Sequence, residues 1–129
     1  MEGDVKPTPK AKGTKKDCYS IIQEIVLARD KVCQHPCCSH QAESGHHVWK
    51  RDRLSVAFLP EALVGLCTQH HTGWAHGDPA AFKLFMVKRL GADRYYELRR
   101  KSYEVVKNLD YQDIYAGLVK VLRAYKKGQ

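Results

Sequence analysis

Apolar residues near the start of the chain recur at three- and four-residue steps, the spacing of one buried helix face. This stripe consists of Ile21, Ile22, Ile25, Val26 and Ala28. It predicts a helix that begins at Asp17, whose carboxylate is expected to cap the free N–H groups. Residues 1–16 are rich in Lys, Pro, Gly and Thr and predict a disordered basic arm, either a solubilising tail or a phosphate-contacting segment.

Three further apolar stripes follow His76. The first of the three corresponding helices is expected to start at Asp78-Pro79, where Asp78 is the cap and Pro79 occupies the first helical position. It is expected to stop at Gly91. Asp110 is the expected cap of the last helix. The stripes are, in order, Phe82, Phe85, Met86 and Leu90; then Tyr95, Leu98, Val105 and Val106, on a segment made basic by Arg94, Arg99, Arg100 and Lys101; then Ile114, Leu118 and Leu122.

The segment between these helical regions, residues 33–76, has no long periodic pattern. Residues 46–49 and 54–58 have the composition of two short strands, and residues 50–53 form a charged connection between them. The pattern as a whole therefore predicts an α+β fold that is mostly helical, with a small centre flanked by α-helices.

The composition bounds the class of protein. A chain of 129 residues has the size of one domain. Its 22 Lys and Arg against 14 Asp and Glu give a net charge of +8, which favours a polyanionic partner such as nucleic acid. No apolar run approaches the roughly 20 residues of a membrane span, and residues 1–4 are not the start of a signal peptide. We expect a cytoplasmic protein, away from the membrane, whose cysteines stay reduced.

Cysteine and histidine are strongly clustered. The chain has twelve of them, and eleven lie between Cys33 and His76, where an even spread would place about four. Structural zinc takes four Cys or His ligands, usually as two close pairs. Here one pair is Cys33 with Cys38 or Cys37, and the other is Cys67 with His70. The competing interpretation is that these cysteines are buried in the core and bind no metal.

The remaining histidines suggest a second site. His46 and His47 are adjacent, and neighbours on an extended segment point to opposite sides, so we expect one to bind a second metal and the other to act as a base. His71 and His76 are five residues apart and are expected to hold one ion from a helix face, although four is the usual step. His35 and His40 are more peripheral.

These residues together resemble the HNH endonucleases, and specifically small phage-type members of that family. The likeness covers roughly residues 27–105. Residues 27–33 are similar to the lead-in to the first zinc cysteine, and residues 33–38 to a knuckle in which Cys38 rather than Cys37 is the ligand. Residues 45–48 and 63–71 resemble the two catalytic blocks, and the helices of residues 82–103 are similar to the tails of small members.

The resemblance implies a zinc-stabilised ββα-metal core and a role for each matching residue. His47 would be the general base. The catalytic ion, Mg²⁺, Mn²⁺ or Ni²⁺, would be bound by His46, His71 and His76, of which His46 and His71 would take direct part in catalysis. The structural zinc would be bound by Cys33, Cys38, Cys67 and His70. The implied activity is one-metal hydrolysis of DNA, expected to be double-stranded, that leaves 5′-phosphate and 3′-hydroxyl ends. Lys50, Arg51 and Arg53 would contact the DNA backbone. No organic cofactor is expected.

Two positions depart from the family pattern. Ala62 stands where the family has an Asn that ties down the loop holding the general base. The interval from His71 to His76 is one residue longer than the common form, and we expect Gly73 to absorb it by a backbone kink.

The resulting division of the chain is a basic arm (1–16), an HNH nuclease domain with its leading and trailing helices (17–108), and a C-terminal helix with a basic tail (109–129). A catalytically silent, zinc-stabilised DNA-binding module is the alternative, and a structural zinc protein that acts through protein contacts is a third. Nicking as against double-strand cleavage, the sequence or structure recognised and the oligomeric state stay open.

Overall fold

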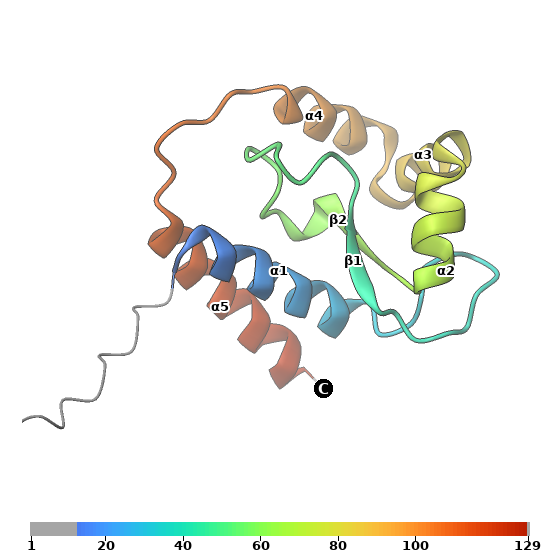
Figure 1. Ribbon diagram of the computed structural model, residues 1–129, viewed down its shortest axis with the longest axis horizontal. Coiled ribbons are helices and arrows are strands. Elements are labelled where there is room, and N and C mark those ends of the chain that lie inside the picture. The colour runs from blue at the N-terminus through green and yellow to red at the C-terminus, as the bar shows by residue number, and fades with distance from the viewer. Residues whose placement is uncertain (1–12, 129) are drawn as a thin grey trace, which may run out of the picture.

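The computed structural model describes residues 13–128, and Figure 1 shows an α+β arrangement in which helices surround one small sheet. Residues 1–12, most of the predicted arm, lie outside this part of the chain. The elements in order are α1 (Lys15–Arg29), β1 (Ser44–His47), the 3₁₀ turn η1 (Pro60–Ala62), β2 (Leu63–Leu66), α2 (Thr68–His70), the π-helical turn η2 (His71–His76), α3 (Pro79–Leu90), α4 (Ala92–Ser102) and α5 (Tyr111–Lys127).

The first helix begins earlier than the pattern predicts. Thr14, not Asp17, is its N-cap: the Thr14 side chain accepts from the backbone N–H of Asp17, and the Asp17 carboxylate accepts in return from the N–H of Thr14. This reciprocal pair is a capping box. Lys15 and Lys16 therefore belong to the helix, and the prediction of a disordered arm through residue 16 is wrong at its end.

The sheet pairs β1 with β2 in antiparallel register, so that His46 faces Val64 and His47 faces Leu63. The strand predicted at residues 54–58 is wrong, because that segment forms turns in which the Arg53 carbonyl accepts from two backbone N–H groups. Val56, Ala57 and Phe58 are nevertheless buried, and a short apolar run does not by itself distinguish a strand from a buried turn.

Helix α5 lies along α1 in Figure 1, and the two share one core. Four of the five residues of the predicted α1 stripe are buried in it and Ala28 is half-buried at its edge, while α5 contributes Leu118 and Leu122. A second core forms around Met86 and Leu66, where α3 packs on β2. Of the helices in residues 13–128, none combines the length and the apolar content that a membrane crossing requires.

The helix boundaries after His76 mostly follow the sequence signals. The Asp78 side chain caps α3, and Gly91 ends it with a φ of 86°, a conformation that favours glycine. Asp110 caps α5. Helix α4 stops at Ser102, so Val105 and Val106 do not extend its buried face as predicted; Val105 is 83% exposed.

Asp30 joins three elements at the end of α1. Its buried carboxylate accepts from both Arg29 and Arg89 and from the backbone N–H of Gly65. A Cβ at Gly65 would lie 2.7 Å from the Cβ of Asp30, so only glycine allows β2 to approach this closely. The contact fixes the strand that precedes Cys67 and His70.

Candidate metal centres and the adjoining cavity

Four predicted zinc ligands lie together. The ligand atoms of Cys33, Cys38, Cys67 and His70 are all within 4.8 Å of one another. The Cys67 Sγ lies 3.3 Å from Nδ1 of His70 and 4.0 Å from Sγ of Cys38. Four ligands in a tetrahedron around zinc are separated by about 3.5 to 3.8 Å, given bond lengths near 2.1 to 2.3 Å. Three thiols and one imidazole thus form a donor set that fits this ion.

The backbone around the first pair explains which of the two neighbouring cysteines belongs to the cluster. A turn closed by the N–H of Cys38 and the carbonyl of His35 brings the Cys38 thiol inward. Cys37 is exposed and is not part of the four-residue group. The His35 ring stacks on His70 with 4.0 Å between centroids, which restricts the orientation of the imidazole.

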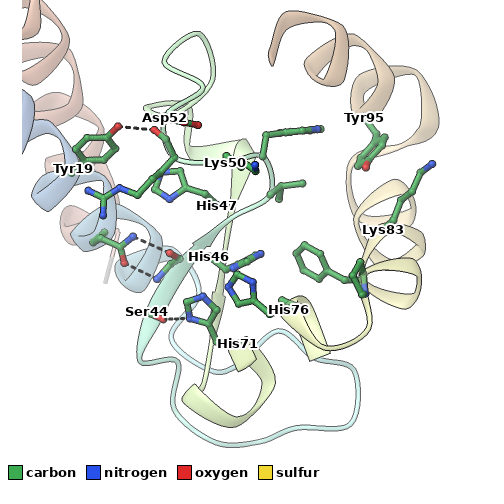
Figure 2. A pocket seen from close by; sticks show the side chains of 18 residues that line it. Tyr19, Ser44, His46, His47, Lys50, Asp52, His71, His76, Lys83 and Tyr95 are labelled. Carbon is green, nitrogen blue, oxygen red and sulfur yellow. Dashed lines mark hydrogen bonds between the residues drawn. The ribbon is translucent and has the colours of Figure 1, made fainter. Parts of the chain in front are cut away.

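A second group consists of three histidines from two elements. His46 on β1 and His71 and His76 on η2 have ligand atoms within 4.8 Å of one another. Figure 2 shows the three rings converging, and the His46 ring lies 4.8 Å from each of the other two. The His46 ring also packs edge-on against Phe82. We call these three residues the histidine trio.

The π-helical turn accounts for the five-residue interval between two members of the trio. A π-helix closes i→i+5 hydrogen bonds, so residues five apart lie on one face, and such turns are frequent at functional sites. The rings of His71 and His76 stack with 5.0 Å between centroids. Gly73, the expected site of a kink, lies inside this turn without a positive φ, so the π-helical turn takes up the added residue. Gly77 is the constrained glycine, since a Cβ there would lie 2.6 Å from the Gly73 carbonyl oxygen.

The environment of two members of the trio, His46 and His71, favours uncharged imidazole, the form that binds a cation. Burial, with the charges of the neighbouring histidines, lowers the pKa of His46 to about 3. Burial and the proximity of His76 also lower the pKa of His71. Ser44, which sequence reasoning missed, lies with its Oγ 3.0 Å from Nδ1 of His71.

His47 points to the other side of β1 from His46, towards Tyr19 (Figure 2). Its Nε2 lies 3.1 Å from the carbonyl oxygen of Ala57. A carbonyl can only accept, so Nε2 carries the proton and the lone pair is on Nδ1. Burial lowers the pKa of His47, the Arg51 charge lowers it further, and the Ala57 hydrogen bond opposes both. The ring is thus held without any side-chain amide at Ala62.

Both histidine sites border one cavity of about 1000 Å³. One wall consists of β1 and the residues that follow it, including Lys50 and Arg51; the opposite wall includes Lys83 of α3 and Tyr95 of α4 (Figure 2). Arg53 does not line this cavity. Its guanidinium donates to the Ser102 carbonyl and lies over the Tyr103 ring, which ties the turn to the end of α4.

Gln23 is a further residue that the sequence did not single out. Its amide donates to the Gly45 carbonyl and accepts from the Gly45 N–H, so it fixes β1 directly before the two histidines. Twenty-two positions separate the partners, and no local pattern reveals such a contact.

The comparisons with known proteins give no relative: no family model, no curated protein and no solved structure matches this chain.

Proposed function

We propose that the protein is a metal-dependent DNA endonuclease of the HNH type, built on a ββα-metal core. The observation that carries the proposal is the placement of two kinds of histidine around one basic cavity. The histidine trio offers three imidazole donors to a divalent cation, and His47 offers a lone pair from the other side of the same strand.

Hydrolysis of a phosphodiester needs an activated water, stabilisation of the charge that develops on phosphorus oxygens, and help for the leaving oxygen. His47 meets the first need by taking the water proton on Nδ1, and its Ala57 hydrogen bond keeps Nε2 protonated meanwhile. A divalent cation such as Mg²⁺, Mn²⁺ or Ni²⁺, when bound by the trio, supplies Lewis-acid stabilisation for the other two.

Among the described residues, three Lys or Arg side chains and one carboxylate, that of Asp52, line the cavity, and this excess of positive charge fits a polyanionic substrate. Lys50 and Arg51 line it beside His47, and Lys83 lines the opposite wall. Contacts from such cations to phosphate position a duplex without reading its sequence. The Cys₃His cluster, with zinc bound, joins the turn at residues 33–38 to the end of β2, and so supports the strands that carry the histidines.

Nicking of supercoiled plasmid in the presence of Mg²⁺ or Mn²⁺ tests the proposal. We expect the wild type to nick and His47→Ala to lose about 100- to 10,000-fold of that rate, the usual contribution of a general base. His40→Ala is the matched control, because this histidine is exposed and belongs to neither group. If the wild type binds DNA yet does not nick, the silent DNA-binding module is correct instead.

A further inference from the structure

A second, smaller cavity of about 570 Å³ adjoins the one described above. It is lined by Lys15, Lys16, Tyr19, Ser20, Gln23 and Arg51, and three of these, Tyr19, Gln23 and Arg51, line the larger cavity as well. The two hollows therefore meet along one side of α1. Of the described residues, those lining the smaller cavity include three cations and no carboxylate.

Arg51 is held at the junction of the two cavities by Tyr19. The Tyr19 hydroxyl donates to the Arg51 carbonyl at 2.6 Å, and the Arg51 guanidinium lies 4.3 Å from the centre of the Tyr19 ring. Both the backbone and the side chain of this arginine are thus fixed to α1. A cation with a restricted side chain loses less conformational entropy when it binds an anion.

The two lysines are also on an ordered element. Lys15 and Lys16 occupy the first turn of α1, directly after the Thr14 capping box. The Asp17 carboxylate in the same turn accepts from the backbone N–H groups of Gly13 and Thr14. Its charge is directed to the helix end and does not line the cavity.

From this arrangement we propose that Lys15, Lys16 and Arg51 form a binding groove for DNA backbone phosphates that flank the phosphate at His47. The inference rests on the proposed function, because it takes the strand in the larger cavity as its starting point. Successive phosphates follow a strand at short, regular intervals, so a chain of cations leading out of the catalytic cavity matches the backbone rather than a base. In this proposal Lys15 and Lys16, which the sequence placed in a basic arm, each contact a specific phosphate.

The test is the salt dependence of binding to a fluorescein-labelled 20-base-pair duplex, without added divalent cation. Each phosphate contact contributes about 0.9 to the slope of log K against log salt. We expect Lys15→Gln/Lys16→Gln to reduce the slope by about two and the affinity by roughly tenfold or more at 0.1 M salt, and Arg51→Gln to reduce the slope by about one. Lys126→Gln/Lys127→Gln, the same charge change on exposed lysines at the end of α5, is the control and should leave the slope close to wild type.

The outcomes separate this proposal from the nuclease assignment. If the Lys15/Lys16 variant binds like the control while the wild type nicks plasmid, the groove is wrong and the nuclease stands. If the slope falls as expected while the wild type never nicks, the groove stands and catalysis does not. Equal slopes of log K against log salt for Arg51→Gln and wild type also overturn the groove, since Arg51 lines both cavities and connects them.

Discussion

Ser44 and His71 are hydrogen-bonding partners, with the Ser44 Oγ 3.0 Å from Nδ1 of the ring. The two residues come from β1 and η2 and are 27 positions apart. A histidine that binds a metal usually donates its other N–H to such a partner, which fixes the tautomer and the ring orientation. In the tautomer that donates Nδ1–H to Ser44, the lone pair of His71 is on Nε2 and can bind a cation.

Ser44→Ala should therefore weaken Mn²⁺ binding at the histidine trio by about 10- to 100-fold, the usual effect of losing such a partner. Titration calorimetry with Mn²⁺ on zinc-loaded protein measures it. Ser20→Ala, an exposed serine on α1, is the control. Unchanged Mn²⁺ affinity in Ser44→Ala would show that the hydrogen bond has no part in metal binding.

The neighbouring cysteines give an internal control for the zinc cluster. Cys38→Ser should lose stoichiometric zinc and melt at a temperature lower by roughly 10 °C or more, because zinc binding is coupled to folding. Cys37→Ser should keep both the zinc and the melting temperature, since that thiol is exposed and outside the cluster. Elemental analysis after dialysis and a thermal melt measure the pair. Equal zinc content in the two variants would contradict the assignment.

The rate of plasmid nicking should depend on pH through His47. The proposed reaction needs the neutral ring, and burial with the Arg51 charge lowers the pKa of His47 despite the Ala57 hydrogen bond. The base form thus persists below pH 6.5, and activity should fall only as pH drops through this lowered pKa. A single-turnover pH profile checks the prediction, and an acid limb centred at or above pH 6.5 argues against it.

Asp30 should make stability depend on pH at the acid end. Burial alone raises its pKa, but hydrogen bonds from Arg29 and Gly65 and the charges of Arg29 and Arg89 outweigh burial, so its pKa is lowered. A carboxyl whose pKa is lower in the folded state stabilises the fold above its unfolded pKa and loses that effect as pH falls through the folded pKa.

Asp30→Asn should consequently lower the free energy of unfolding by about 3 kcal/mol at pH 7, because two arginines lose a buried partner. Urea unfolding at pH 7 and at pH 3 measures the difference, which should shrink at the lower pH. Asp93→Asn, an exposed carboxylate in the first turn of α4, is the control and should change stability little. A loss for Asp30→Asn that is the same at both pH values would contradict the role of the charge.

The sequence predicts the helices and the grouping of the zinc ligands well, for a common reason: the relevant residues are close in the chain. The α1 stripe, the Asp78 cap and the Cys67–His70 pair are local patterns. The true start of α1 was also within reach, since Thr14 and Asp17 have capping-box spacing. The second strand was not, because Leu63–Leu66 is buried along its whole length and has no alternation.

The walls of the cavity depend on contacts between distant segments. Lys83 and Tyr95 come to face His46 only because α3 packs on β2 and α4 follows it. The Ala57 carbonyl that holds His47 is likewise a backbone atom in a turn, so no residue type marks it. The chemistry of a side chain can be predicted from the sequence. A backbone hydrogen-bond acceptor, or the residues that form the opposite wall of a cavity, can be identified only once the fold is known.

In the π-helical turn η2, the number of residues between two histidines does not by itself determine how close their rings lie. An added residue in an α-helix would ordinarily rotate everything after it by about 100° around the axis. Here the five-residue interval lies within the π-helical turn η2, α3 begins separately at its own Asp78 cap, and the rings of His71 and His76 still stack. A sequence motif that requires the two histidines four positions apart would not match His71 and His76, although their rings stack.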